Sequence, residues 1–134
     1  MSQSQVGARP PFTIERKQGK APSTVIFRLC GPFTARSMYE SLPPVALQNM
    51  LAFQSLPGEE APVLNILDLT DVPYIDSSGL GEIVRHYVRC KRRGIEFFAA
   101  GAGPRVLELF KMTKVDSVIP MIVSVEAADV QAPS

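Results

Sequence analysis

The sequence predicts an α/β domain built on a mixed central sheet. Residues 12–16 and 24–30 alternate apolar with polar side chains around a turn-rich stretch, which predicts an opening hairpin. After residue 62, apolar strand-like runs alternate with segments of helical periodicity, the pattern of parallel β/α units with helices packed on the sheet. With 134 residues and 46% hydrophobic side chains, the chain has the size and composition of one globular domain.

The domain boundaries follow from the composition at the two ends of the chain. Residues 1–11 are polar, contain glycine and proline and show no periodicity, and residues 131–134 have the same character. We therefore expect a flexible arm and a flexible tail on either side of one domain of residues 12–130.

The middle of the chain carries helical patterns and then a buried strand. Residues 35–42 and 45–54 have helical spacing, and the Pro43-Pro44 pair between them predicts a break, because proline cannot lie in a helix interior. Residues 63–69 form a nearly continuous apolar run. Such a run is typical of a strand that is covered on both faces of a sheet.

A long amphipathic helix is expected after this strand. Its apolar residues recur at the spacing 0, 3, 4, 7, 8, which predicts a stripe packed against the core. Gly94 ends the helix, and Lys91, Arg92 and Arg93 lie in its last turn, where cations suit the negative end of the helix dipole. The expected stripe consists of Leu80, Ile83, Val84, Tyr87 and Val88.

The last part of the chain predicts one more β/α unit and a final helix. Residues 95–100 form the next strand, and a helix runs from Pro104 to about Met112, since proline is accepted in the first turn. Residues 118–120 are a short strand candidate, and Ser124 is placed to cap the final helix.

A polar, glycine-containing motif joins the buried strand to the long helix. It reads Asp76-Ser77-Ser78-Gly79-Leu80-Gly81 and falls at the carboxyl end of the strand, where open α/β sheets usually place their binding surface. Asp76 or Ser77 can cap the helix, which is a purely structural role. A cap does not need the two glycines, each of which costs about 1 kcal/mol relative to alanine in a helix. They leave the first turn open to another macromolecule.

Residues 63–130 resemble a STAS domain of the anti-sigma-factor-antagonist type, and the first half of the chain is consistent with it. The resemblance rests on the apolar strand that ends in Asp68, on the Asp-Ser-Ser-Gly-Leu-Gly turn and on the basic helix that ends at Gly94. It continues through Val-Leu-Glu-Leu-Phe at residues 106–110 and Ser-Val-Glu-Ala-Ala near the end. The resemblance implies a single STAS-like domain.

The resemblance also implies a bacterial regulatory switch that is not an enzyme. In such proteins the serine after the aspartate, here Ser77, is phosphorylated by a partner anti-sigma factor that is also a serine kinase. The unphosphorylated form binds that kinase and frees a sigma factor for transcription, and a serine phosphatase resets the switch. Asp76, Ser78, Gly79 and Gly81 are then expected to shape the partner-binding surface, with Ser78 as the second candidate for the phosphoacceptor.

Two other functions stay open at this point. STAS domains also serve as scaffolds or transporter-associated subunits, in which the turn would serve packing alone, and a nucleotide- or lipid-sensing module is the third reading. The chain departs from many relatives in Gly31-Pro32-Phe33-Thr34, which has no acidic residue, and in the long interrupted segment 35–60. The oligomeric state also stays open.

The charge distribution argues for a docking surface on one side of the domain. The formal net charge of +1 disfavours global binding to a polyanion, yet residues 80–114 contain eight Lys or Arg against three acids. No aromatic residues interleave the basic helix face for base stacking, so we expect it to be solvated or turned to an acidic partner rather than to bind nucleic acid directly. This face consists of Arg85, Arg89, Lys91, Arg92 and Arg93.

No residue pattern predicts catalysis. His86, the single histidine, is expected on the solvated side of the long helix, and a triad with Ser77 lacks the Gly-x-Ser-x-Gly context. The Gly-Ala-Gly-Pro segment at residues 101–104 lacks the spacing of a phosphate loop and predicts a plain strand-to-helix turn. Asp68 and Asp71 flank a turn and are expected to cap it or to be solvated.

Cysteine usage and hydropathy indicate a cytoplasmic protein without cofactor or metal. Cys30 and Cys90 are far apart and have no metal-ligand spacing, so we expect free thiols in core or helix-face positions. The first residues do not resemble a secretory signal. No apolar stretch approaches the roughly twenty residues that a membrane span needs.

Overall fold

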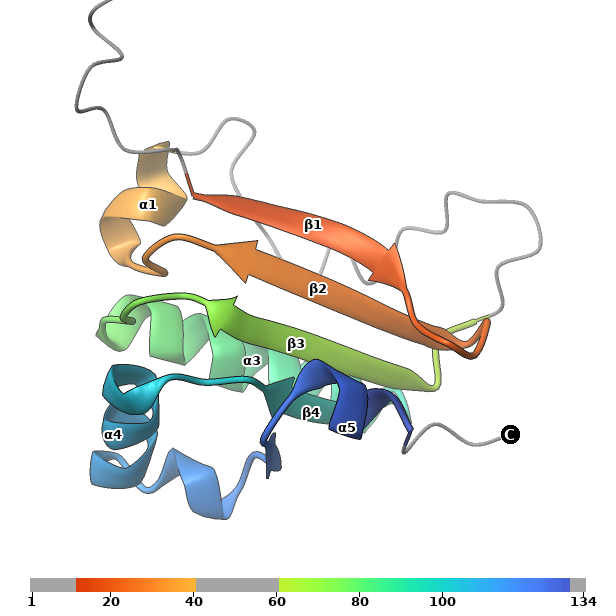
Figure 1. The fold of residues 1–134 in the computed structure, drawn as a ribbon. Coiled ribbons are helices and arrows are strands. Elements are labelled where there is room, and N and C mark those ends of the chain that lie inside the picture. The colour runs from red at the N-terminus through yellow and green to blue at the C-terminus, as the bar shows by residue number, and fades with distance from the viewer. Residues whose placement is uncertain (1–11, 41–60, 131–134) are drawn as a thin grey trace, which may run out of the picture.

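The computed structural model describes residues 12–40 and 61–130, in which a five-stranded sheet carries helices on both faces (Figure 1). The first two strands are antiparallel, and every later strand pairs in parallel with the one before it, so the strands lie in chain order. This confirms the predicted mixed sheet with an opening hairpin. The strands are β1 (Thr13–Gln18), β2 (Thr24–Cys30), β3 (Leu64–Asp71), β4 (Glu96–Ala100) and β5 (Met121–Ile122).

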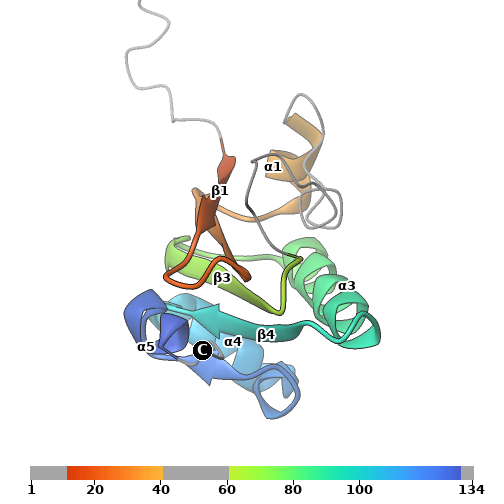
Figure 2. The same ribbon diagram turned by 90° about the vertical axis from the view of Figure 1, so that its right-hand side faces the viewer.

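The helices divide between the two faces of the sheet, as Figures 1 and 2 show. Residues of the long helix and of the helix after β4 share a large core with one face, whereas the last helix packs with a smaller cluster on the other face. Burying each large apolar side chain in these cores contributes roughly 1.5–3 kcal/mol. The helices are α1 (Ala35–Glu40), α3 (Ser77–Arg92), α4 (Pro104–Met112) and α5 (Val125–Asp129).

Strand β3 runs through the middle of the sheet and is covered on both faces, as its apolar run predicts. Its first six residues are all buried. Leu67 lies in the larger core together with Phe27 and Phe97 of the neighbouring strands, while Ile66 faces the smaller cluster with Phe98. Because β3 is fixed on both sides, the turn that follows its carboxyl end has a rigid base.

The inward face of α3 differs from the predicted stripe. Leu80 and Ile83 are buried as expected, but the prediction is wrong for Val88, whose side chain is 38% exposed. His86 and Cys90 face the sheet instead, and both are fully buried. The predicted solvated position of His86 is therefore wrong as well. Both cysteines are free, and Cys90 fills a core position as predicted.

The strand predicted at residues 118–120 is also wrong. After α4, Lys114 adopts a positive φ of 63°, and the chain enters a short 3₁₀ turn at Val115–Ser117. Ile119 donates its backbone N–H back into this turn and packs its side chain into the core. The ladder to β4 is therefore delayed until Met121.

Some predictions fall outside the residues that the structure describes. These are the arm at residues 1–11, the tail at 131–134 and the second helical pattern at 45–54 with the proline pair before it. Within residues 12–40 and 61–130, no helix is long and apolar enough to cross a membrane.

Candidate functional site

The Asp76–Gly81 motif lies where the parallel strands end and α3 begins. After β3, Ile75 forms an isolated parallel bridge with Phe33, which follows β2. Ser77 is the first residue of α3, a helix of 16 residues. The structure therefore confirms that the motif is a strand-to-helix turn at the carboxyl edge of the sheet, the edge at which α/β domains usually bind ligands and partners.

Asp76 fixes this turn by capping two helices at once. Its Oδ1 atom accepts a hydrogen bond from the N–H of Gly79 at 2.9 Å, which makes it the N-cap of α3. Its Oδ2 atom accepts from the N–H of Ala35 at 3.0 Å, the first residue of α1. Of the two capping candidates, Asp76 is therefore the one that caps the helix, and the Ser77 side chain makes no hydrogen bond to the other described residues.

Ser77 and Ser78 are exposed and have unused hydrogen-bonding groups. Within residues 12–40 and 61–130, neither hydroxyl and neither backbone N–H has a hydrogen-bond partner. The first turn of α3 also contains no acidic residue. A long helix start with free N–H groups favours an anion, because the helix dipole places partial positive charge there.

The two glycines of the motif, Gly79 and Gly81, differ in the space that surrounds them. A Cβ atom on Gly79 would lie 2.0 Å from the carbonyl oxygen of Phe33, so only glycine permits the close approach of the two segments. A Cβ atom on Gly81 would meet nothing nearer than the Arg85 side chain at 3.5 Å, which is ordinary contact. Gly79 is buried and shapes the turn from within, whereas Gly81 has no packing reason to be glycine.

Two elements that sequence reasoning missed also border the turn. The guanidinium of Arg105, in the first turn of α4, lies 4.8 Å from the ring centroid of Tyr74, three residues before Ser77. Such cation–π contacts stabilise an exposed cation by about 0.5–1 kcal/mol and fix its position. The first turn of α1 is held to Asp76 by Ala35. Gly79 was the sequence signal for close packing at this turn, but a glycine does not indicate which segment packs against it.

The basic helix face is spread along α3 rather than gathered at Ser77. Arg85, which forms an ion pair with Glu82 at 3.0 Å, lies about two turns from Ser77 and one turn from Gly81, beside which its side chain lies. Lys91 and Arg92 stand at the opposite end, roughly 20 Å away at 1.5 Å per residue. The predicted one-sided basic surface is thus divided, and its last-turn cations match the helix dipole.

His86 belongs to a buried polar pair and not to a catalytic group. Its Nε2 atom lies 2.6 Å from Oδ1 of Asn65, and the amide of Asn65 donates to the carbonyl of Val25 at 3.0 Å. Because the amide orientation makes Oδ1 an acceptor, the proton sits on Nε2. Burial lowers the pKa of His86 to about 4, with a smaller effect from the charge of Arg89, so the ring is neutral at pH 7. A triad with Ser77 is not formed.

The remaining chemical candidates have structural roles in the described residues. Burial raises the pKa of the Cys90 thiol to about 12, which keeps it protonated. Asp68 caps its own turn by accepting from the N–H and the hydroxyl of Thr70 at 3.0 and 2.6 Å. Gly101 has a φ of 76° in the strand-to-helix turn predicted there. No group of three or more His, Cys, Asp or Glu in residues 12–40 and 61–130 is arranged to hold a metal ion.

The fold and the site define a small α/β domain that presents a serine-containing turn at the edge of a mixed sheet. A family model supports a closer assignment, because the model of the STAS domain matches residues 20–128. The chain belongs to the STAS domain family. The comparison with curated proteins found no match.

Solved structures from two functional groups share this fold. An anti-sigma factor antagonist from Mycobacterium paratuberculosis superposes with a TM-score of 0.73 at 17% identity, over 92% of this chain and 97% of the other. A sulfate transporter family protein from Wolinella succinogenes gives 0.66 at 20% identity, over 81% and 84%. An anti-sigma-factor antagonist (STAS) domain protein from Planctomyces limnophilus gives 0.66 at 18%, over 88% and 96%. At these identities the likeness concerns the fold.

Proposed function

We propose that this STAS domain is a phosphorylation-gated regulatory protein, an anti-sigma factor antagonist with Ser77 as its phosphoacceptor. The observation that carries the proposal is the exposed hydroxyl of Ser77 at the start of a long helix, which no residue in the described part of the chain engages. The fold shared with anti-sigma factor antagonists supports it. In this role the domain works in the cytoplasm by binding, and it catalyses no reaction itself.

The chemistry of the switch belongs to a partner serine kinase. The kinase transfers the γ-phosphoryl group of ATP to Oγ of Ser77, so that an O–P bond forms, the bond to ADP breaks and the hydroxyl proton passes to a base of the kinase. The product carries about −1.5 to −2 charge and three acceptor oxygens. A serine phosphatase reverses the step by hydrolysis.

The fold is expected to survive this modification. The free N–H groups of Ser77 and Ser78 favour the added anion, and the Asp76 carboxylate at the N-cap is the one neighbouring acidic group of the motif, with both oxygens already engaged by backbone N–H groups. The effect therefore falls on the partner, which meets new charge and bulk at its docking surface. In the unmodified state the kinase, which is also the anti-sigma factor, binds this surface and releases its sigma factor.

Each residue of the motif has a distinct part in the proposed surface. Asp76 holds the serine in place through its two caps. Gly79 lets the turn pack against Phe33, and the open position at Gly81 leaves room for a partner side chain. Ser78 offers a neighbouring hydroxyl on the same exposed turn.

A structural role in a transporter is the second candidate, favoured by the fold shared with the Wolinella succinogenes protein. In that case the motif would serve only packing and interface formation. The two candidates differ in one measurable respect, because a scaffold does not depend on the charge at Ser77.

Affinity capture with charge variants tests the proposal. The unmodified chain is expected to retain a serine-kinase partner that Ser77→Asp loses, while Ser117→Asp, which adds the same charge at an exposed serine of the 3₁₀ turn, retains it. Equal capture by all three would favour the scaffold. With the purified kinase and ATP, mass spectrometry should find phosphate on Ser77 and none on the Ser77→Ala variant; full modification of that variant would sink the assignment.

A further inference from the structure

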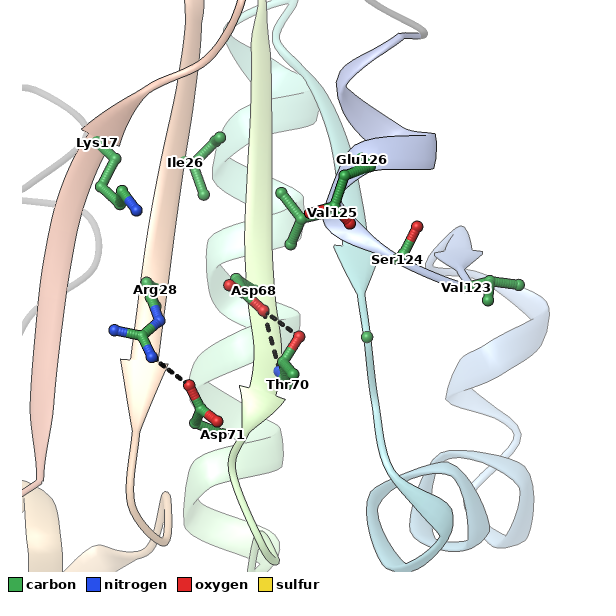
Figure 3. A pocket seen from close by; sticks show the side chains of 11 residues that line it. Lys17, Ile26, Arg28, Asp68, Thr70, Asp71, Val123, Ser124, Val125 and Glu126 are labelled. Carbon is green, nitrogen blue, oxygen red and sulfur yellow. Dashed lines mark hydrogen bonds and ion pairs between the residues drawn. The ribbon is translucent and has the colours of Figure 1, made fainter.

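A cavity of about 480 Å³ lies between the sheet and α5, and Ser77 takes no part in its lining (Figure 3). Its walls come from β1, β2, β3 and the start of α5, so elements distant in sequence build it together. Pockets for small molecules occupy roughly 300–1,000 Å³. The cavity therefore has the size of a small-molecule site and lies apart from the proposed docking turn.

One wall of the cavity is cationic. Lys17 of β1 extends into it, and its ammonium group forms no ion pair within the described residues (Figure 3). Arg28 of β2 is held beside it by an ion pair with Asp71, with Glu15 a further 3.7 Å contact. The hydrogen bond to Asp71 raises the pKa of Arg28. Asp71, which also lines the cavity, therefore balances the charge of Arg28, and Lys17 is the cation of this wall that has no counter-ion within the described residues.

The floor and the opposite wall are anionic. Asp68 is the cross-strand neighbour of Arg28, yet Arg28 pairs with Asp71 instead. The Asp68 residue is only 9% exposed, and both hydrogen bonds from Thr70 go to Oδ1, so no described residue donates to Oδ2. Glu126 of α5 lines the other side and likewise forms no ion pair within residues 12–40 and 61–130.

The Oδ2 atom of Asp68 is accessible from the cavity, so it can accept a hydrogen bond from a molecule that enters. Here the open oxygen of Asp68 stands one strand away from a cationic wall, and neighbouring strands are about 4.8 Å apart. A pure anion in the cavity would meet Asp68 and Glu126, and a pure cation would meet Lys17 and Arg28. A ligand that carries both charges close together satisfies both walls.

We propose that this cavity binds a free α-amino acid with an apolar side chain. Its carboxylate lies toward Lys17 and Arg28, and its ammonium group donates to Oδ2 of Asp68 and to Glu126. The side chain of the ligand packs on the apolar part of the lining, which includes Ile26 and Val125. The inference is independent of Ser77 phosphorylation, so either can fail without the other.

A titration of the full chain with L-leucine tests the proposal. We expect saturable shifts of the backbone amide resonances of Lys17, Asp68 and Glu126 in a ¹H–¹⁵N spectrum. Two truncated probes separate the charges, since 3-methylbutylamine lacks the carboxylate and 4-methylpentanoate lacks the ammonium group. Each should bind at least about tenfold more weakly than L-leucine, because each loses one set of charge-assisted hydrogen bonds. Saturation by either probe at the concentration that suffices for leucine would overturn the assignment, as would no saturation by L-leucine, L-valine or L-methionine.

Variants then locate the site. Lys17→Gln, Asp68→Asn and Glu126→Gln should each weaken L-leucine binding by roughly tenfold. Lys111→Gln and Glu108→Gln on α4 remove the same charges outside the cavity lining and should leave binding unchanged.

The control for these variants is that they fold. Lys17 and Glu126 are exposed, so their variants are expected to fold, which thermal unfolding checks. Equal losses in the control variants would show a general charge effect and contradict the site. Ser77→Ala should bind L-leucine normally.

Discussion

The two halves of α3 use polar side chains in opposite ways. At its start, Ser77 and Ser78 are exposed, and the described residues leave their hydroxyls without partners. In its second half, His86 is fully buried and donates its Nε2 proton to Oδ1 of Asn65 at 2.6 Å, while its Nδ1 atom has no hydrogen-bond partner within the described residues. The hydrogen bond of His86 lies inside the fold and contributes to its stability, whereas the exposed hydroxyls at the start of the helix are accessible to another molecule.

The same contrast separates the two glycines of the motif. Gly79 is required by the fold, because the carbonyl of Phe33 occupies the space of a side chain. Gly81 carries the helix-propensity cost of a glycine, about 1 kcal/mol, with no contact that explains it. Packing within the fold does not explain the glycine at this position, so we relate it to the proposed binding of a partner at the turn.

The largest expected effect comes from Gly79→Ala. The added methyl group would overlap the Phe33 carbonyl at 2.0 Å, so the backbone must shift, and we expect a loss of roughly 3 kcal/mol in the free energy of unfolding, or no folding. Gly81→Ala is the matched variant and should be neutral or stabilising by up to about 1 kcal/mol. Urea denaturation of both variants checks the contrast, and similar losses in the two would break it.

The buried His86 side chain of α3 makes the stability of the fold depend on pH. The pKa of His86 is lowered to about 4 in the folded chain, so between pH 6.5 and 4 the unfolded state binds a proton that the folded state does not. Its contribution is complete above pH 6.5 and is lost as the pH falls toward 4, by about 2–3 kcal/mol at roughly 1.4 kcal/mol per pKa unit. His86→Gln does not titrate, so its unfolding free energy should fall less over this range. Parallel pH dependence of the two proteins would contradict the assignment.

The two caps of Asp76 predict an intermediate effect. Asp76→Ala removes the acceptors of the Gly79 and Ala35 N–H groups and should cost about 2 kcal/mol, since one cap contributes about 1 kcal/mol. Asp76→Asn keeps one carbonyl acceptor and should lose about half as much. Thermal unfolding measures both, and an unchanged midpoint for Asp76→Ala would show that the caps do not hold the turn.

The smallest effect on stability is expected at the phosphoacceptor itself. Ser77 makes no hydrogen bond within the described residues, so Ser77→Ala should change the free energy of unfolding by no more than about 0.5 kcal/mol. Ser77→Asp should be neutral or slightly stabilising because of the helix dipole. A loss of 2 kcal/mol or more by urea denaturation, on the scale of a cap, would give Ser77 a structural role after all.

The sequence predicted the first four strands, the long helix and the place of the motif, because apolar periodicity and capping residues are local signals. The sequence did not reveal that His86 is buried, because Val88 continues the apolar spacing of the helix. The hydrogen-bond partner of His86 is Asn65, which lies on β3 and is distant in sequence. The single asparagine in the apolar run of β3 was the available clue. The contact of Gly79 with Phe33 joins segments 46 positions apart, and no local pattern encodes it.

The affinity of the kinase partner for the unmodified and the Ser77-phosphorylated chain tests the central claim most directly. Calorimetry with the two purified forms is predicted to show binding at least about tenfold weaker after phosphorylation, because the new charge and bulk stand on the docking turn. Thermal unfolding of the phosphorylated chain should remain within a few degrees of the unmodified one. Equal affinity of the two forms for the partner would contradict the account.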